Sequence, residues 1–182
     1  PAQTFEVNLL GTVHLVAALL EHCPEARLVF IGSSEVYGIP VSLPVTEEHP
    51  VNPANPYAIS KAAADAYCAW AHRACGLDVV RVRPFNHSGP GQAPAFVLPD
   101  FAAQIARIER SGAPGVIRVG NLDRARDFLH VRDVVRAYER LALEGVSGAA
   151  YNVCSGRAVP VRAALDRLLR LSSAAIRVEP DP

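Results

Sequence analysis

The amino-acid sequence predicts an α/β protein with a parallel β-sheet whose faces are covered by helices. Three observations support this fold class: helical and strand patterns alternate, the predicted strands are short apolar runs, and the composition is that of a globular protein. The 182 residues are 50% hydrophobic and 20% charged, which is enough apolar content to bury a core. Alternating strands and helices are typical of βαβ units, in which helical crossovers join parallel strands.

The first predicted elements are a helix and a strand. Over residues 4–22 apolar side chains recur at helical spacing, and residues 27–32 form a short apolar run typical of a buried strand. The next segment, 33–56, is rich in Pro, Ser, Asn and Gly, so we expect a loop there.

A second helix and strand follow the loop. Residues 57–75 are dominated by alanine, a strong helix former, and Gly76 is well placed to end that helix before a strand over 78–83. The stretch 84–94 contains three prolines and two glycines, so we expect it to be irregular. The remaining expected elements are a helix over 96–110, an apolar segment at 116–119, a helix over 131–144, a strand over 150–153 and a helix over 161–171.

Charge and hydropathy exclude several classes of partner. The 18 Lys and Arg residues balance the 18 Asp and Glu residues, so no global field attracts nucleic acid or an anionic membrane. No apolar run approaches the roughly 20 residues that span a bilayer, and no signal-peptide pattern stands at the start. We therefore expect a cytoplasmic protein with neither a nucleic-acid nor a membrane partner.

The four cysteines show neither CxxC nor metal-ligand spacing. We therefore expect buried free thiols in a reducing compartment, with no disulfide and no metal site. These residues are Cys23, Cys68, Cys75 and Cys154.

The start of the chain indicates a fragment of a longer protein, because Pro1 stands just before a helical pattern and the chain has no methionine. No GxGxxG turn, which binds dinucleotide phosphates between a strand and a helix, is found in the sequence. We expect the segment that would hold a dinucleotide to be missing, and the isolated chain to bind NAD(P) poorly.

Tyr57 and Lys61 form the strongest candidate for chemistry. Lys61 is the only lysine in the chain and lies four residues after Tyr57 at the start of a predicted helix, so the two side chains share one face. A phenol has an ordinary pKa of about 10, and a neighbouring ammonium lowers that pKa by favouring the phenolate. Tyr57 could then give or take a proton, although the pair alone is also consistent with an ordinary surface contact.

The strand over 27–32 runs into Ser33 and Ser34, which places hydroxyls at a strand's carboxyl end, where ligands bind in open α/β sheets. Together with this turn, five motifs resemble the extended short-chain dehydrogenase/reductases in order and spacing across nearly the whole chain. The motifs are Asn8-Leu-Leu-Gly11-Thr12, Gly32-Ser-Ser-Glu-Val-Tyr-Gly38, Asn55-Pro-Tyr57-Ala-Ile-Ser-Lys61, Arg83-Pro-Phe-Asn86 and Arg126-Asp-Phe-Leu-His130-Val.

The resemblance implies a fold with two parts. Residues 1–90 would be the C-terminal half of a Rossmann-type doubly wound parallel sheet and would carry the catalytic residues. Residues 91–182 would be mostly a smaller α/β substrate-binding domain, interleaved with the end of that sheet. The N-terminal dinucleotide-binding units of the family would be missing from this chain.

The resemblance also implies roles for the residues at the strand end. Tyr57 would be the general acid/base at a sugar oxygen, and Lys61 would lower the pKa of Tyr57 and bind the nicotinamide ribose. Ser33 would bind the reacting oxygen, and Pro84 would lie at the cofactor, NAD or NADP. Ser33 is preferred to Ser34 because it stands four residues before Tyr37, as the catalytic Ser or Thr of the family does.

Glu35 leaves two interpretations open. It stands where the dehydratases of this family keep a catalytic glutamate, which assists proton removal and water loss. It could equally be a loop carboxylate that binds backbone amides.

The resemblance places Asn86 and Arg126 at the diphosphate of a nucleotide sugar and Val97 near its base. An amide can donate to a phosphate oxygen, and a guanidinium can bind phosphate through two hydrogen bonds. For Arg126 the alternative is a structural salt bridge to Asp123 or Asp127.

Within the family the motifs are most similar to GDP-4-keto-6-deoxy-mannose reductases and next to GDP-mannose 4,6-dehydratases. The implied activity is therefore NAD(P)-dependent reduction of GDP-4-keto-6-deoxy-mannose to a GDP-6-deoxy-hexose. Dehydration or epimerisation of a nucleotide sugar remains an alternative, as does a non-catalytic fragment that only binds the nucleotide sugar. The helices over 4–22 and 57–75 resemble those through which family members form homodimers.

Overall fold

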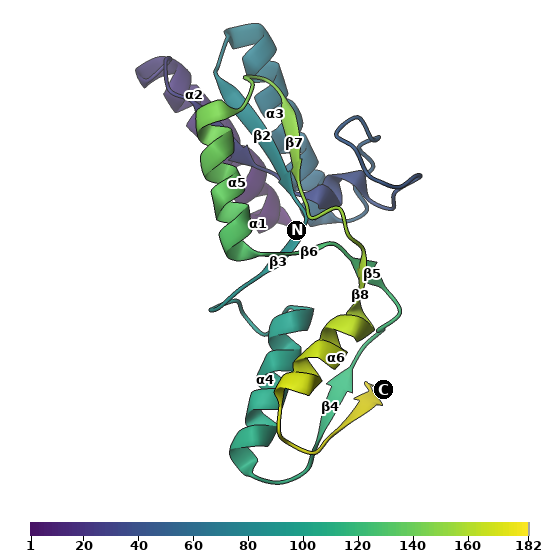
Figure 1. Ribbon diagram of the computed structural model, residues 1–182. Coiled ribbons are helices and arrows are strands. Elements are labelled where there is room, and N and C mark those ends of the chain that lie inside the picture. The colour runs from purple at the N-terminus through teal and green to yellow at the C-terminus, as the bar shows by residue number, and fades with distance from the viewer. Residues whose placement is uncertain (182) are drawn as a thin grey trace. The chain divides into compact units, whose positions relative to one another are not determined.

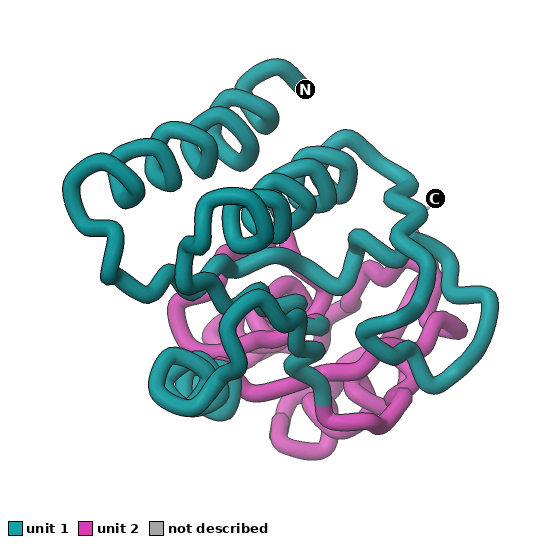
Figure 2. Tube along the Cα trace, turned by 90° about the horizontal axis from the view of Figure 1, so that it is seen from above, with its two compact units in different colours: residues 1–85, 132–154 teal, residues 86–131, 155–182 magenta. Residues whose placement is uncertain are grey.

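A computed structural model describes residues 1–181 of the chain. The chain divides into two compact units, each built from two separate chain segments (Figure 2). Unit 1 comprises residues 1–85 and 132–154, and unit 2 comprises residues 86–131 and those from 155 onward. The interpretation of residues 1–90 and 91–182 as a sheet part and a substrate-binding part stays a prediction.

Unit 1 contains a three-stranded parallel sheet in the order β1-β2-β7. Strands β2 and β7 lie side by side in Figure 1. Its elements are α1 (Ala2–Phe5), the π-helical turn η1 (Glu6–Leu10), α2 (Gly11–His22), β1 (Leu28–Ile31), the 3-10 turn η2 (Ser34–Tyr37), α3 (Pro56–Cys75), β2 (Val79–Pro84), α5 (Val131–Glu144) and β7 (Ala150–Val153). Leu28 of β1 lies opposite Val79 of β2, and Arg81 of β2 lies opposite Ala150 of β7. The expected α/β class with a parallel sheet is confirmed.

The core of unit 1 lies between the sheet and the helices α2 and α3. Alanines on α3 allow the helix to approach the strands closely, and each fully buried Val or Leu side chain contributes about 1.5–3 kcal/mol. On β2, Val79 belongs to this core, whereas Val80 lies beside Gly145 just after α5, so successive side chains cover opposite faces of the sheet. The buried core residues are Val16, Phe30, Ala64, Cys68, Ala71, Leu77 and Val79.

The helical stretch from Ala2 to His22 is long and apolar enough, by length and composition, to cross a membrane, with 21 residues and a mean hydropathy of 1.2. No unbroken apolar run marks this stretch in the sequence, because polar residues are mixed with its many apolar ones. The core helix of a soluble protein passes the same test. Here one side of the stretch packs within unit 1: Val16 is fully buried, and Asn8 Nδ2 donates to Ser60 Oγ of α3 at 3.0 Å.

Unit 2 is built around the parallel strand pair β4–β9, against which α4 and α6 pack. Its elements are β3 (Asn86–Ser88), α4 (Val97–Ser111), β4 (Gly115–Val119), β5 (Ala125–Arg126), β6 (Phe128–His130), β8 (Val159–Pro160), α6 (Val161–Leu171) and β9 (Ile176–Pro180). Strands β3 and β6 pair in parallel and β5 and β8 antiparallel. The buried core residues are Phe101, Ile105, Ile117, Val119, Leu122, Val161 and Leu165.

The environment of the cysteines differs from the expectation of buried thiols. All four cysteines are thiols, but only Cys68 is buried, and the other three are exposed. Cys23 and Cys75 lie at the C-terminal ends of α2 and α3, where the helices leave the core. Burial raises the pKa of Cys68 to about 12, so this thiol stays protonated at neutral pH.

Candidate active site

Strand β1 ends in a tight turn that presents Ser33. Gly32 is buried, and a Cβ there would lie 3.0 Å from the carbonyl oxygen of Val82, so glycine allows β1 to end in close contact with β2. Ser33 is only 9% exposed, and its Oγ caps η2 by accepting a hydrogen bond from the Glu35 amide at 3.2 Å. Because the hydroxyl is the acceptor in this bond, it keeps its hydrogen for a further partner.

Asn55 starts α3 and joins it to the turn after β1. Its Oδ1 accepts from the Ala58 amide at 2.8 Å as the helix N-cap, while its Nδ2 donates to Glu35 Oε2 at 3.0 Å. Pro56 occupies the first helical position, where a missing N–H is not needed. The first turn of α3 therefore lies beside η2.

Tyr57 and Lys61 lie one turn apart on α3, as the sequence predicts. Tyr57 is 42% exposed. Lys61 is partly buried, and its Nζ donates to the carbonyl oxygen of Ile31 at 2.9 Å and lies 5.8 Å from the centre of the Phe30 ring. Burial lowers the pKa of Lys61 below its ordinary value. The ammonium is thus directed at the carboxyl end of β1, immediately before Ser33.

One end of the unit 1 sheet therefore gathers the candidate catalytic residues. The hydrogen bonds from Asn55 to Glu35 and from Lys61 to Ile31 hold α3 against this end. Pro84, the candidate cofactor residue, is buried at the end of β2, the strand that pairs in parallel with β1, so it lies at the same end of the sheet. The candidate catalytic residues gathered here are Ser33, Glu35, Tyr57 and Lys61.

The two interpretations of Glu35 remain open. The side chain is exposed, and its carboxylate accepts from the side-chain amide of Asn55. A bond to a side-chain amide orients the carboxylate towards the start of α3. The role of Glu35 in dehydration stays a prediction.

The three candidate substrate residues belong to unit 2. Asn86 is the exposed first residue of β3 and lies opposite Phe128 of β6, two residues after Arg126. The register of β3 and β6 therefore keeps Asn86 and Arg126 close together. Val97 is the first residue of α4 and is 40% exposed.

Arg126 does not form the salt bridge that was its structural alternative. Its Nη1 donates to the carbonyl oxygen of Ala125 at 2.9 Å, and no acidic side chain pairs with it within residues 1–181. The Asp127 carboxylate instead accepts from the backbone amides of Ser155 and Gly156 at 2.8–3.0 Å. These amides satisfy Asp127 and leave the exposed Arg126 guanidinium without an acidic partner.

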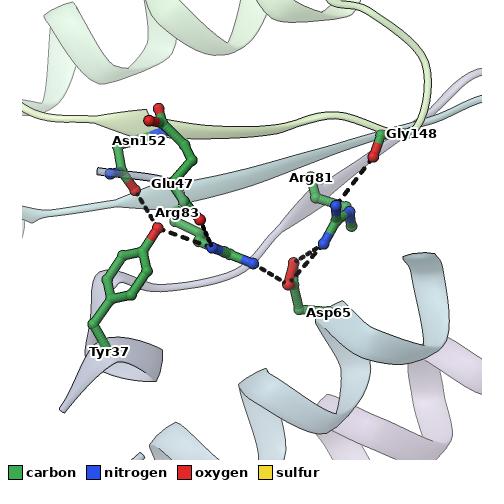
Figure 3. Close-up of polar contacts among 7 residues, drawn as sticks. All are labelled: Tyr37, Glu47, Asp65, Arg81, Arg83, Gly148 and Asn152. Atoms are coloured by element: carbon green, nitrogen blue, oxygen red, sulfur yellow. Dashed lines mark hydrogen bonds and ion pairs between the residues drawn. The ribbon is translucent and has the colours of Figure 1, made fainter. Parts of the chain in front are cut away.

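A buried polar network in unit 1 was not anticipated from the sequence (Figure 3). Asp65 Oδ2 accepts from Arg83 Nη2 at 2.7 Å and from Arg81 Nη1 at 3.1 Å, and Arg83 Nη1 also donates to Tyr37 Oη at 2.9 Å. Tyr37 Oη donates in turn to Asn152 Oδ1 at 2.8 Å.

The hydrogen bonds of the network keep Arg83 protonated. Burial by itself lowers the pKa of Arg83, but the hydrogen bonds to Asp65 and Tyr37 outweigh burial, and the net pKa is raised. Burial also raises the pKa of Tyr37, so its hydroxyl remains a donor. The sequence signal for this network was the pair Arg81 and Arg83, spaced two residues apart in an apolar strand. Both side chains point to one face of the sheet, and an arginine needs an acidic partner when it is buried.

Comparison with known proteins shows the family of the chain. Residues 1–178 match the family described as GDP-mannose 4,6 dehydratase. The chain belongs to this family. Membership in the wider group of nucleotide-sugar epimerases, dehydratases and reductases, predicted from the sequence motifs, is confirmed.

Individual relatives include reductases and dehydratases. Over its full length the chain is 41% identical to GDP-6-deoxy-D-mannose reductase of Pseudomonas aeruginosa, of which it covers 60%. It is 32% identical to GDP-mannose 4,6-dehydratase of Sordaria araneosa over 89% of the chain and 30% of that protein.

Two solved structures show the shared fold. The structure of RMD from Pseudomonas aeruginosa complexed with NADPH matches with a TM-score of 0.94 at 41% identity, over 100% of this chain and 62% of that one. The dTDP-glucose 4,6-dehydratase of Bacillus anthracis in complex with NAD matches with a TM-score of 0.83 at 26% identity. This match covers 98% of this chain and 57% of that one. The chain thus spans about 60% of the length of the Pseudomonas aeruginosa protein.

Proposed function

We propose that this chain is the catalytic and substrate-binding part of an NAD(P)H-dependent reductase that converts GDP-4-keto-6-deoxy-mannose to a GDP-6-deoxy-hexose. The observation that carries the proposal is the gathering of Ser33, Tyr57 and Lys61 at the carboxyl end of β1. The 41% identity to a GDP-6-deoxy-D-mannose reductase over the whole chain supports the choice of substrate.

Tyr57 would act as the general acid of this reduction. Its phenolic hydroxyl, on a half-exposed side chain, gives its proton to the carbonyl oxygen of the sugar, which becomes a hydroxyl. The Ser33 hydroxyl, whose oxygen accepts from the Glu35 amide, donates its hydrogen to the same sugar oxygen. The Lys61 ammonium stabilises the phenolate left on Tyr57 until that phenolate regains a proton from solvent.

The residues at this end of the sheet fit the nicotinamide half of NADPH or NADH. Lys61 uses one N–H for the Ile31 carbonyl, which leaves two donors for ribose hydroxyls, and Pro84 offers a buried apolar surface at the end of β2. When bound, the reduced nicotinamide supplies the hydride to the carbonyl carbon. The phosphates need a glycine-rich turn, which these 182 residues do not contain.

We assign the GDP part of the substrate to unit 2. Arg126 is exposed and without an acidic partner within residues 1–181, so its guanidinium can bind the diphosphate through two hydrogen bonds. Asn86, held near Arg126 by the pairing of β3 with β6, would donate to the same group. Val97, exposed at the start of α4, would contact the guanosine.

Dehydration of GDP-mannose is the second candidate. It is favoured by the family description and by Glu35, whose carboxylate lies in η2 beside the first turn of α3. In a dehydration this carboxylate would take a proton from one sugar carbon and return it to the hydroxyl that leaves the neighbouring carbon, so that water departs and a carbon–carbon double bond forms.

A substrate comparison separates the two candidates. The chain is produced with a dinucleotide-binding segment fused to its N-terminus. This segment comes from the chain's own gene where the reading frame continues upstream, and otherwise from the Pseudomonas aeruginosa relative. It is given GDP-4-keto-6-deoxy-mannose with NADPH or NADH, and separately GDP-mannose with NADP. Oxidation of NADPH or NADH by the 4-keto sugar supports the reductase, whereas formation of the 4-keto sugar from GDP-mannose supports the dehydratase. Binding of GDP-sugar without turnover of either substrate would contradict both.

We further propose that the protein is a homodimer through the N-terminal helical stretch and α3. Both expose apolar side chains to solvent, including Val7 at 67%, Leu10 at 47%, Ile59 at 43% and Trp70 at 45%. Light scattering should give a dimer that Trp70→Glu dissociates. Leu143→Glu, which changes a 76% exposed leucine on α5, is the control and should leave the dimer intact. A wild-type monomer at high concentration would contradict the assignment.

A further inference from the structure

Arg83 joins two elements that each carry a candidate catalytic residue. Its side chain is 6% exposed, and it donates to Asp65 Oδ2 at 2.7 Å and to Tyr37 Oη at 2.9 Å (Figure 3). Asp65 belongs to α3 and Tyr37 to η2. One guanidinium on β2 therefore bridges the helix and the turn.

Both ends of this bridge lead to the candidate active site. On α3, Asp65 follows Lys61 by four residues and Tyr57 by eight, so the three side chains share one face of the helix. The turn η2 has Ser33 as its N-cap and Tyr37 as its last residue. A shift of η2 relative to α3 would therefore move Ser33 relative to Tyr57.

The chemistry of the bridge suits positioning. A guanidinium is planar and donates in fixed directions, so it sets both the distance and the angle between the groups that it binds. Buried ion pairs usually contribute little more net stability than well-packed apolar groups of the same volume. Here Arg83 Nη1 is shared with the Glu47 carbonyl oxygen at 3.2 Å, and Tyr37 Oη is held by Asn152, so the position of each group is determined by several bonds.

We propose that the Asp65–Arg83–Tyr37 bridge positions the proton-transfer site, holding the turn that carries Ser33 against the face of α3 that carries Tyr57 and Lys61. This inference rests on the proposed function. Its most selective test is Tyr37→Phe, which deletes one oxygen. The ring is kept, and with it the edge-on contact to His49, at 5.8 Å between ring centres, and the packing against Arg83.

The matched control is Tyr151→Phe. The Tyr151 hydroxyl accepts from the Val146 amide at 2.9 Å and takes no part in the bridge, so this variant also deletes one hydrogen-bonded phenolic oxygen from unit 1. Both variants are made in the protein that carries the dinucleotide-binding segment. The measurements are kcat per folded active site, KM for the 4-keto sugar, and the isotope effect with NADPH deuterated at the transferred position.

A misplacement of about 1 Å can lower turnover by about 10²-fold, so we expect Tyr37→Phe to lower kcat by about 10-fold or more, with little change in KM. The isotope effect should increase, because the chemical step becomes slower relative to binding and release. Tyr151→Phe should leave all three quantities unchanged. An unchanged kcat in Tyr37→Phe would overturn the inference. A lower kcat with an unchanged isotope effect would also overturn it, because the slowed step would then be one other than hydride and proton transfer.

Two further measurements separate this inference from the proposed function. Tyr57→Phe is assayed in parallel, and full activity of that variant would refute the proposed function alone. Hydrogen exchange of the amides in 33–38 does not depend on turnover. Faster exchange in Tyr37→Phe than in Tyr151→Phe supports the positioning of this turn, and equal exchange would overturn it even if no substrate is turned over.

Discussion

Replacing Asp65 by asparagine removes the charge that balances the buried Arg83 and the partly buried Arg81. Asp65 is 4% exposed, and its Oδ2 lies 2.7 Å from Arg83 Nη2 and 3.1 Å from Arg81 Nη1. Asparagine has nearly the same volume but no negative charge, so the buried guanidinium of Arg83 and the partly buried guanidinium of Arg81 would lose their counter-charge. The free energy of unfolding should therefore fall.

The size of the fall follows from the burial of the network. Breaking a buried ion pair by removing one partner costs about 3–5 kcal/mol. Asparagine still offers a carbonyl oxygen to Arg83, so we expect the lower end, about 3 kcal/mol. For 150–250 residues this corresponds to a decrease in Tm of roughly 6–12 °C.

The control is Asp133→Asn in the first turn of α5. Asp133 pairs with Arg136 at 3.1 Å, but the two side chains are 59% and 73% exposed, and an exposed pair of this kind contributes about 0.5 kcal/mol or less. Urea unfolding followed by circular dichroism gives both free energies. Equal stability of the two variants would refute the idea that the buried charges depend on Asp65.

Three further predictions concern the turns, Lys61 and the cofactor. Gly38 has φ +62° and a Cβ there would overlap the Asn52 carbonyl, whereas Gly76 has φ +74° and open space around it. For Gly76→Ala we expect the free energy of unfolding to fall by roughly 1–2 kcal/mol, the strain of a left-handed backbone conformation. Gly38→Ala should lower it by more, and equal losses for the two variants in urea unfolding would contradict this. Because burial lowers the pKa of Lys61 below 10.5, the unfolded chain binds more protons just below that pH, so stability should rise with pH there relative to Lys61→Met. If the difference in the free energy of unfolding between the wild type and Lys61→Met stayed constant with pH, the prediction would be refuted. Calorimetry should show only weak NADPH binding by the isolated 182 residues, and tight binding would show that the phosphates need no glycine-rich turn.

Local sequence patterns predicted most long elements closely. The helices at 97–111, 131–144 and 161–171 lie within one residue of their expected limits, because their apolar side chains recur on one face. Gly76 ends α3 in the left-handed conformation, as expected. Such signals depend on neighbours in the chain, which the sequence displays directly.

Elements that depend on distant partners were missed. Strand β9 forms at Ile176–Pro180 by pairing with β4, and β3 forms within the stretch 84–94, which was expected to be irregular, by pairing with β6. Both strands are short, and their pairing partners lie far along the chain. Their local sequences alone therefore gave no sufficient signal.

The candidate site was predicted only in part for the same reason. The spacing of Tyr57 and Lys61 follows from a helix, but the bond from Lys61 to Ile31 and the bond from Asn55 to Glu35 depend on packing. Asp65 lies in an alanine-rich helix whose pattern gives no sign that two arginines of β2 bind it. The two arginines indicate that an acidic partner is needed, but the residue that supplies it becomes visible only in the structure.

The most direct test of the central claim is the kcat of Tyr57→Phe for reduction of GDP-4-keto-6-deoxy-mannose by NADPH, in the protein that carries a dinucleotide-binding segment. We expect kcat to fall by about 10²–10⁴-fold, the usual contribution of a positioned acid, while the affinity for the GDP-sugar stays nearly the same. An unchanged kcat would show that the proton comes from another group and would contradict the assignment of Tyr57.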